Sequence, residues 1–497
     1  MDEITSHKIQ KIRDLRGRGV DPFPARGPAR THGAREVVEG ALERQVSAAG
    51  RLVQIRQMGK ASFAHLQDET GKLQLYFKKD ILGDAPYQSF KDDLAVGDFI
   101  AVEGRTFKTK TNETTVEVAK FTLLAKAIRP LPEKWHGLTD TEERHRRRHL
   151  DLISNPEVRQ TFADRSKIVS AVRKAFSDRG FLEVETPVLL SQAGGAAARP
   201  FQTHHNALDQ KMVLRIATEL YLKRLIIGGF EKVYEIGRIF RNEGIDTRHN
   251  PEFTMLEAYQ AYADYGTMAE LLEGVFSECC AALGRTEIEY RGMKVPLKPP
   301  FKRAYLPELW KTGTGEDIHA VLDGKRFNHA KLVALANRLA LPASAETPGA
   351  KIFERIFDGK ILPQLDGPTF VLDHPTAITP LAKTKPGDEA LVERFEFFIG
   401  GEELANAYSE LNDPIDQRER FAEQARQATE EKEEEAQLLD EDFVEAMEVG
   451  MPPTGGIGIG IDRLVMLFTG KSSIREVILF PTLRNECLSN SSSPAAT

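Results

Sequence analysis

The placement of short segments with strand-like alternation constrains the fold more than any other feature of this sequence. Beyond residue 155, such segments lie at 229–241, 252–260, 370–373, 394–411 and 456–461, with helical patterns between them. Tight turns join neighbouring segments, and helices do not follow strands in regular β–α–β alternation. This order favours an α+β domain, with an antiparallel sheet flanked by helices, over a doubly wound dinucleotide-binding fold.

A second group of strand-like segments lies nearer the N-terminus and predicts a small closed barrel. These segments are GRLVQIR, ASFAHLQDE, KLQLYF, GDFIAVEG and TTVEVAKFTLL, with one helical interval near 87–93. Five strands with one short helix are typical of an OB fold. A proline-containing stretch, RPLPEKWHGL, and a basic helix near 144–148 separate this barrel from the rest of the chain.

The chain is too long for a single core, and its patterns predict five segments. They are a helical arm at 1–45 interrupted by a Pro-Phe-Pro run, the barrel at 46–130, a linker at 131–155, a large domain at 156–490 with a helical insertion at about 310–365, and a disordered tail at 491–497.

Composition excludes several classes of protein. The N-terminus lacks the apolar stretch of a secretory signal, and the longest apolar runs are too short to span a membrane. Cys279 and Cys280 are adjacent and Cys487 stands alone, so neither a disulfide framework nor a paired zinc knuckle is expected. We therefore expect a cytosolic protein without transmembrane segments.

Charge is distributed unevenly along the chain. The net charge is −7, yet residues 1–150 contain 27 Lys and Arg against 21 Asp and Glu. A basic N-terminal part joined to an acidic remainder fits a region that meets a polyanion. A solvated surface without functional consequence explains the same asymmetry equally well.

Two phosphate-binding motifs are incomplete. The run TGKS at 469–472 resembles the end of a P-loop, but Val465 stands where its first glycine is required. The glycines at 456, 458 and 460 lack the G-x-G-x-x-G spacing and alternate with isoleucine, as in a buried strand. We expect these glycines to let a flat group lie against the strand.

Charged residues lie on apolar strand faces in the segment FEKVYEIGRIFRNEGIDTRHNPEFTMLEAYQAY. Alternation puts Phe253, Met255, Glu257 and Tyr259 on one face, and Arg241 on the face of Val233 and Ile239. A buried carboxylate is costly unless it meets a cation, which indicates a binding site. An internal Arg–Glu ion pair is the alternative interpretation.

A third strand pair, FEFFIGGEELANAYSELND, turns at Gly400–Gly401 and puts Asn406, Tyr408 and Glu410 on one face. If the three segments share one sheet, these residues and those around Glu257 line a single cavity. Such a cavity suits an extended cation like a lysine side chain, whose apolar stem contacts tyrosines while carboxylates hold its ammonium.

Long motifs in the chain resemble those of the class II lysyl-tRNA synthetases of the bacterial type. The motifs are GFLEVETP with Pro187, followed by GGAAARPF and THHNALD; FRNEG with RHNPEFTMLE; and GIGIGIDRLVM. The resemblance covers about residues 8–485. It implies that 46–130 is an OB-fold anticodon-binding domain and that 156–490 is a class II synthetase catalytic domain.

The resemblance implies roles for particular residues toward ATP and magnesium. Arg241 and Arg463 are the implied catalytic residues, because Arg241 holds the α-phosphate and the amino-acid carboxylate while Arg463 and Phe253 enclose the adenine ring. Glu243 receives the adenine amino group, and His249 and Asn250 reach ATP. Glu396 and Glu403 are the implied ligands of Mg²⁺, the one cofactor, beside ATP as co-substrate; alternation alone does not pair them.

The resemblance also implies two recognition sites. The implied lysine pocket comprises Gly195, Glu219, Glu257, Tyr259, Asn406, Tyr408 and Glu410. In the barrel, Arg56, Phe63, Gln74 and Glu113 match positions that bind a uridine-rich anticodon, with Phe63 stacking on a base. An alternative interpretation places Phe63 in the barrel core, where aromatic residues on strands usually lie.

The implied activity is that of a lysine–tRNA ligase. Lysine reacts with ATP to give lysyl-adenylate and pyrophosphate, and the lysyl group then passes to the 3′ end of tRNA(Lys). A homodimer is implied, because the first motif resembles a dimer-forming element.

Three alternatives remain at this point. A synthetase for aspartate or asparagine would present cations to its substrate, whereas this pocket presents glutamates. A paralogue that modifies a protein with a lysine-like acid would lack the barrel, and a protein that only binds nucleic acid would leave the glutamate-bearing strands unexplained.

Overall fold

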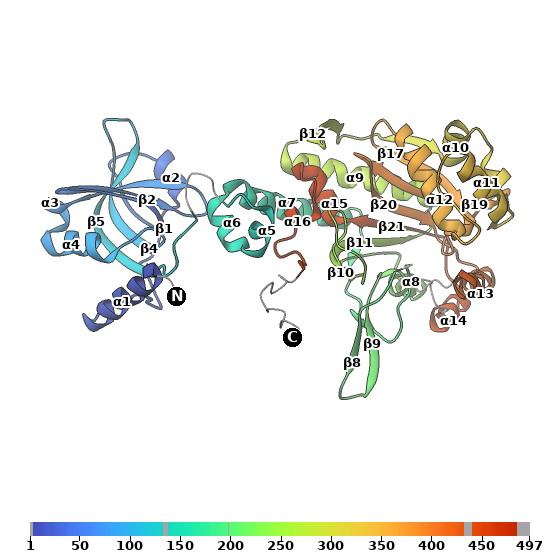
Figure 1. Ribbon diagram of the computed structural model, residues 1–497, viewed down its shortest axis with the longest axis horizontal. Helices are drawn as coiled ribbons and strands as arrows, with labels where there is room; N and C mark the ends of the chain where they lie inside the picture. Colours follow the sequence, from blue (N-terminus) through green and yellow to red (C-terminus); the bar gives the residue numbers. More distant parts are fainter. Residues whose placement is uncertain (1–2, 133–137, 197, 432–439, 485–497) are drawn as a thin grey trace, which may run out of the picture. The chain divides into compact units, whose positions relative to one another are not determined.

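The computed structural model describes the chain except for residues 1–2, 133–137, 197, 432–439 and 485–497. The chain divides into two compact units, Met1–Thr139 and Asp140–Thr497 (Figure 1). The predicted tail at 491–497 and Cys487 lie outside the described residues.

The first unit is a closed five-stranded barrel in the order β1-β2-β3-β5-β4. Its strands are β1 (Gln45–Met58), β2 (Ala61–Gln67), β3 (Lys72–Lys78), β4 (Phe99–Lys108) and β5 (Thr114–Ala125). Neighbouring strands are antiparallel except β3 and β5, which are parallel. Helices α3 (Lys79–Leu82) and α4 (Asp84–Asp93) separate β3 from β4, as the helical interval near 87–93 predicted.

The N-terminal arm contains α1 (Glu3–Gly17) and α2 (Ala34–Glu39). Leu15 of α1 and Ala34 and Val37 of α2 belong to the buried cluster that fills the barrel. The arm therefore packs on the barrel through apolar side chains.

The second unit is built on one large sheet in the order β14-β17-β19-β20-β21-β11-β10-β6, with β18 paired to β19. Its strands are β6 (Leu182–Glu183), β10 (Lys232–Phe240), β11 (Glu252–Ala261), β14 (Lys302–Tyr305), β17 (Thr369–Pro375), β18 (Thr384–Lys385), β19 (Asp388–Ile399), β20 (Glu402–Ser409) and β21 (Thr454–Gly460). The six central strands from β17 to β10 are mutually antiparallel. The α+β prediction is confirmed.

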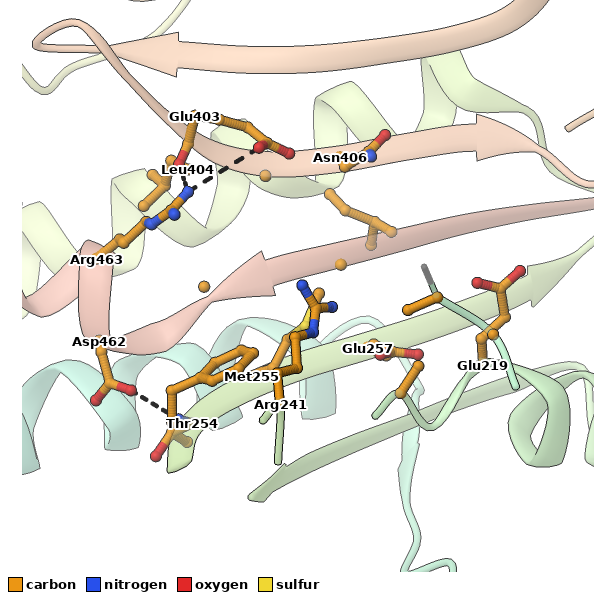
Figure 2. Close-up of a pocket in the computed structure, with 18 of the residues that line it drawn as sticks. Glu219, Arg241, Thr254, Met255, Glu257, Glu403, Leu404, Asn406, Asp462 and Arg463 are labelled. Carbon is orange, nitrogen blue, oxygen red and sulfur yellow. Dashed lines mark hydrogen bonds and ion pairs between the residues drawn. The ribbon is translucent and has the colours of Figure 1, made fainter. Parts of the chain in front are cut away.

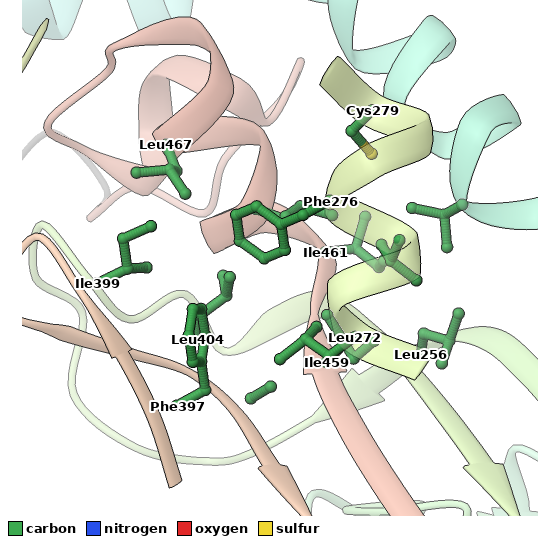
Figure 3. Packing of buried hydrophobic residues seen from close by; sticks show 14 of the residues in the cluster. Leu256, Leu272, Phe276, Cys279, Phe397, Ile399, Leu404, Ile459, Ile461 and Leu467 are labelled. Atoms are coloured by element: carbon green, nitrogen blue, oxygen red, sulfur yellow. The ribbon is translucent and has the colours of Figure 1, made fainter. Parts of the chain in front are cut away.

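One face of this sheet packs against helices (Figure 3). The helices are α7 (Pro156–Ser177), α9 (Tyr265–Leu283), α15 (Ile461–Thr469) and α16 (Ile474–Val477). Phe276 of α9 is buried among Phe397, Phe301 and Phe468, with ring centroids 5.0–5.6 Å apart. Replacing such a core ring with alanine typically costs about 3–5 kcal/mol.

Smaller elements surround the sheet. Helices α5 (Thr141–Arg146) and α6 (Arg148–Ser154) belong to the second unit, and Arg148 Nε donates to Leu479 O at 2.9 Å. A separate apolar cluster holds α10 (Leu306–Thr314), α11 (His329–Arg338) and α12 (Gly349–Ile356) near β17. A hairpin of β8 (Gln202–His205) and β9 (Gln210–Leu214) pairs with β7 (Leu189–Leu190), and α8 (Glu219–Ile227) follows it.

The remaining elements are short or lie late in the chain. They are β12 (Glu287–Tyr290), β13 (Met293–Pro296), β15 (Leu322–Asp323), β16 (Arg326–Phe327), α13 (Pro414–Glu431), α14 (Glu441–Glu448), and the helical turns η1 (Ile318–Val321), η2 (Phe357–Ile361), η3 (Leu362–Gln364) and η4 (Thr376–Ile378).

Candidate active site and nucleic-acid interface

A cavity of about 470 Å³ lies on the sheet face opposite the α9 helix. Strands β11, β20 and β21 form its floor, and α8 and the loop after β10 contribute its walls. Every residue that the sequence assigned to ATP, lysine or magnesium lines this cavity. Figure 2 shows Arg241, Glu257 and Asn406 directed toward the same space from different segments.

The glycines of β21 make the floor of the cavity flat. Gly456 and Gly458 line it, while Ile457 and Ile459 point to the opposite face and enter the apolar core. A Cβ atom on Gly456 would overlap Glu410 Oε1, and one on Gly458 would lie 2.5 Å from the Met255 methyl carbon. The glycines of β21 thus leave space on the cavity face of the strand, whereas its isoleucines fill the apolar core on the other face.

Three buried carboxylates and two tyrosines form one end of the cavity. Tyr408 Oη donates to Glu219 at 3.0 Å, and Thr218 N donates to Glu257 Oε1 at 3.2 Å. Glu410 Oε1 accepts no hydrogen bond within the described part of the chain. Burial, with Glu219 nearby, raises the pKa of Glu257 to about 7. These groups form an electronegative pocket that lacks a full set of partners.

Gly195 and Glu219 enter the pocket from segments that strand alternation does not describe. Gly195 has φ of +84°, and a Cβ there would lie 3.1 Å from Ala217 Cβ, so both backbone conformation and space favour glycine. Glu219 is the first residue of α8, where the helix dipole favours a carboxylate. The N-terminus of α8 therefore lies against the cavity face of the sheet and adds a carboxylate to the pocket.

Lys223 is a residue of this region that the sequence analysis did not identify. It lies one helical turn after Glu219 and is fully buried. Its Nζ is 2.5 Å from Glu219 Oε1 and also forms an ion pair with Glu410. The spacing of four residues from Glu219 is the signal that could have revealed it.

Arg241 follows the last residue of β10 and lies at the centre of the cavity wall. Its guanidinium carbon is 5.3 Å from the Phe253 ring centroid, and its buried Nε donates no hydrogen bond within the described residues. Burial lowers the pKa of Arg241, and Glu243, Glu257 and Glu403 oppose that shift. Arg241 forms no salt bridge among the described residues, so the internal Arg–Glu pair is not found.

Arg463 lies in the first turn of α15, on the opposite side of the cavity from Arg241. Its Nη1 donates to Glu403 O at 2.6 Å (Figure 2), and its Nη2 is 3.5 Å from His249 Nε2. The preceding residue, Asp462, accepts from Arg165 at 2.6 Å and from Thr254 N at 2.6 Å. Asp462 therefore fixes the start of α15 to β11 and α7. The sequence analysis did not identify this residue, although its position beside Arg463 in the motif GIGIGIDRLVM could have drawn attention to it.

The loop between β10 and β11 supplies Glu243, His249 and Asn250. Glu243 is exposed at the cavity mouth. Asp246 Oδ2 lies 2.9 Å from His249 Nδ1 and so holds the imidazole ring in place. Asn250 is buried, donating to Glu252 O at 2.6 Å and accepting from Thr482 N at 3.2 Å. Asn250 thus ties the loop to the C-terminal segment, whereas His249 and Glu243 keep their outer atoms accessible.

Glu396 and Glu403 come together through an irregularity in β20. Phe397 pairs with Ala405 and Phe398 with Glu403, so Leu404 is an extra residue that reverses the alternation. Arg394 contacts Glu396 Oε1 at 2.5 Å and Asn406 Oδ1 at 3.0 Å. Burial raises the pKa of both carboxyls, with Glu396 also raising that of Glu403. Two such carboxylates and an accompanying phosphate are suitable ligands for Mg²⁺. Arg394 was not identified from the sequence.

The barrel unit carries a separate polar and aromatic face. Arg56 is the register partner of Phe63, and Phe63 packs on Tyr76 with centroids 4.9 Å apart. Gln74 Nε2 donates to Glu113 Oε2 at 2.7 Å. Phe63 is not among the residues that fill the barrel, so its core interpretation is wrong. His65, 3.4 Å from Glu113, is an additional member of this face.

Comparisons with known proteins agree with this division. Residues 140–484 match the family model described as tRNA synthetases class II (D, K and N), and residues 46–130 match the OB-fold nucleic acid binding domain. Among the described helices, none has both the length and the apolar character that crossing a bilayer requires.

Full-length relatives narrow the family further. A lysine–tRNA ligase of Carboxydothermus hydrogenoformans is 50% identical over 97% of this chain and 98% of its own length. Lysine–tRNA ligases of Enterococcus faecalis (51% identical over 96% of each chain) and Bacillus subtilis (50% identical over 95% and 96%) are similarly close. The chain therefore belongs to the class II aminoacyl-tRNA synthetases, which are ATP-dependent aminoacyl-tRNA ligases, and within them to the lysine–tRNA ligase family.

Proposed function

We propose that this protein activates L-lysine with ATP to give lysyl-adenylate and pyrophosphate, and then transfers the lysyl group to the 3′ end of tRNA(Lys). The observation that best supports this function is that three glutamates and two tyrosines meet at one end of the cavity: Glu219, Glu257, Glu410, Tyr259 and Tyr408. This end suits a cationic side chain and rejects an acidic one, because buried carboxylates repel each other unless a cation intervenes. The relatives that are named lysine–tRNA ligases support the same assignment.

The lysine side chain would lie between Tyr259 and Tyr408, with its ammonium near Glu219 and Glu410. Gly456 is the register partner of both tyrosines and leaves room for the apolar stem. Glu257 and the backbone near Gly195 would receive the α-amino group, and Asn406 would complete the wall. Arg241 would then hold the substrate carboxylate beside the ATP α-phosphate.

ATP would occupy the remainder of the cavity. The adenine ring would lie between Phe253 and Arg463, with its amino group donating to Glu243 and with His249 and Asn250 in the adjoining loop near the nucleotide. Arg241 and Arg463 would stabilise the charge that grows on the phosphates as the lysine carboxylate attacks in line. Removing one such donor typically costs on the order of 10²–10³ in rate.

Glu396 and Glu403 would hold Mg²⁺ against the ATP phosphates. The support is their raised pKa values, because burial and mutual proximity disfavour two negative charges without a nearby cation. Magnesium would neutralise phosphate charge when bound. A Glu403→Gln variant should need more Mg²⁺ for half-maximal activity, and an unchanged requirement would contradict this role.

The barrel would read the anticodon. Phe63 offers a half-buried ring, packed on Tyr76, for stacking on one base, and Arg56, Gln74 and Glu113 offer donors and acceptors to base edges. The basic character of residues 1–150 favours approach of the tRNA backbone.

Two copies of the chain would associate as a symmetric dimer. Leu182 of β6, Val188 just before β7 and Leu189 of β7 expose 48%, 38% and 46% of their surface, and such exposed apolar side chains suit an interface. The edge position of β6 in the sheet and the prevalence of two-fold symmetric assemblies also support this proposal.

The deciding experiment offers each of the twenty standard amino acids separately, with ATP and Mg²⁺, first in pyrophosphate exchange and then in charging of unfractionated tRNA. Exchange and charging with lysine alone are expected. Charging with another amino acid would overturn the pocket assignment, and exchange without charging would favour a protein-modifying enzyme.

A further inference from the structure

A buried cation already lies behind the proposed lysine pocket. Lys223 Nζ contacts Glu219 Oε1 at 2.5 Å and forms a second ion pair with Glu410. The aromatic rings of Tyr408, Tyr259 and Phe443 lie around it, with centroids 5.7–5.9 Å from Nζ. Lys223 is fully buried and does not line the cavity, so its ammonium is a permanent neighbour of the carboxylates and not a group that occupies the substrate's place.

The charges in this cluster are unequal. Glu219 and Glu410 share Lys223, which leaves one negative charge over, and Glu410 Oε1 accepts no hydrogen bond within the described residues. That oxygen lies where a Cβ of Gly456 would be, at the cavity floor. The pocket therefore presents an unmet acceptor to one additional cation, and no more than one is needed to balance this pair.

Without Lys223, Glu219 and Glu410 would be buried with no ion-pair partner among the described residues. Burial raises the pKa of Glu410 well above its ordinary value, and Lys223 is the leading influence that opposes this rise. The pKa of Lys223 itself is raised, because Glu219 and Glu410 outweigh the opposing effect of burial. A protonated carboxyl group binds neutral polar groups as readily as cations, so loss of the internal cation would remove the basis for selecting an ammonium.

We propose that Lys223 is the internal counter-ion of the lysine pocket: it balances one charge of the Glu219–Glu410 pair and holds both carboxylates in position, and so sets the preference for a cationic amino acid. Lys223 is a positioning residue, because it acts through the two carboxylates and does not touch the substrate. This inference rests on the proposed function, since it assigns a role within the same pocket.

Neutral variants test the proposal in lysine-dependent pyrophosphate exchange. Lys223→Met removes the charge at similar length, and Lys223→Gln removes it but keeps a hydrogen-bond donor. We expect KM for lysine to rise by about 100-fold in each variant, because loss of one partner of a buried pair is costly. The KM for ATP should not change, and the preference for lysine over norleucine, which lacks the terminal amine, should fall.

The pH profile separates a charge effect from a packing defect. The titratable and charged groups that face the cluster are Glu219, Glu257, Tyr259, Tyr408, Glu410 and, farther away, Arg394. Without the Lys223 charge, Glu410 takes up its proton at higher pH. The rise of kcat/KM for lysine with pH should therefore continue to a higher pH in the variants than in the wild type, whose rise levels off above about pH 7.5.

Lys126→Met is the matched control. Lys126 is also buried and paired with one carboxylate, Asp98 at 2.5 Å, but it lies in the barrel unit. This variant should keep the wild-type KM for lysine and the wild-type pH profile in exchange, which needs no tRNA. Thermal unfolding of all variants reports whether they fold, and Lys223→Gln decides the outcome if Lys223→Met does not fold.

Unchanged lysine KM and pH profile in the neutral variants would overturn the inference. Equal losses toward lysine and ATP, without a change in pH profile, would also overturn it, because they would show a structural role. Wild-type protein that fails to exchange with lysine would instead overturn the proposed function, so the two failures are distinguishable.

Discussion

Glu235 and Glu257 are register partners on β10 and β11, yet they have different surroundings. Arg215 Nη1 contacts Glu235 Oε1 at 2.5 Å, and Thr186 Oγ1 donates to Glu235 Oε2. Glu257 receives the Thr218 amide and forms no salt bridge within the described part of the chain. Glu235 thus belongs to an internal network of ion pairs and hydrogen bonds, whereas Glu257 faces the cavity, where a ligand can bind it.

The raised pKa of Glu257, about 7, makes lysine binding depend on pH. Near pH 7 the carboxyl group of the empty site is partly protonated, and a cationic ligand favours its ionised form. Affinity for lysine should therefore rise with pH from about 5.5 to 7.5 and level off above, changing at most about tenfold per pH unit. Calorimetry in buffers of different ionisation enthalpy should detect proton release at pH 6.5; Glu257→Gln should abolish it, and pH-independent binding by the wild type would contradict this assignment.

Arg241→Ala should lower lysine-dependent pyrophosphate exchange by at least about a hundredfold, because it removes the buried donor that we propose for the phosphates and the substrate carboxylate. The control is Arg238→Ala, since Arg238 lies near the end of β10, close to Arg241 in the chain, but forms an exposed ion pair with Glu252 at 3.5 Å. The measurements are the pyrophosphate exchange rate of each variant, which reports the loss of activity, and its thermal unfolding, which reports whether it is folded. Comparable activity in the two variants would exclude the proposed role of Arg241.

Gly456→Ala should weaken lysine binding, because the added methyl group would overlap Glu410 and crowd Tyr259. Displacement of one carboxylate should raise KM for lysine by about tenfold or more, with KM for ATP nearly unchanged. Gly367→Ala is the control, because a Cβ there has no atom within 4 Å. Should Gly456→Ala affect ATP and lysine alike, the close contact would not be specific to the lysine end.

Phe63→Ala should weaken tRNA recognition by about 1–3 kcal/mol, the usual worth of stacking one base on an aromatic ring. Pyrophosphate exchange should remain normal, because the cavity proposed to bind lysine and ATP lies in the other unit. Phe63→Tyr keeps an aromatic ring and should restore charging. The measurement is kcat/KM for tRNA, and equal loss in both variants would argue against stacking.

Leu189→Asp should convert the proposed dimer to a monomer, since it places a charge within the exposed apolar segment. Ile415→Asp is the control; Ile415 is 73% exposed on α13, away from this segment in the chain. Sedimentation velocity at micromolar concentration distinguishes the states. A monomeric wild-type protein would contradict the dimer proposal.

Strand periodicity alone predicted much of the pocket. Glu257 and Tyr259 on β11, Asn406 and Tyr408 on β20, and Glu410 directly after β20 lie on the cavity face as their alternation required. The same rule explains β21, where isoleucines enter the core and glycines face the cavity. Side chains of a regular strand alternate between two faces, so a local pattern is sufficient to assign them.

Contacts between distant segments determined the rest. The extra residue Leu404 in β20 brings Glu403 beside Glu396, and no simple alternation contains such a bulge. Lys223 and Arg394 each pair with a carboxylate of their own element, Glu219 and Glu396. The contacts of Lys223 with Glu410 and of Arg394 with Asn406 form only after α8, β19 and β20 have packed. The sequence by itself determined the two domain types, the family and the faces of the regular strands. Tertiary structure decided which charges are paired and which face the cavity, because burial and the distance between charges arise only when the segments pack together.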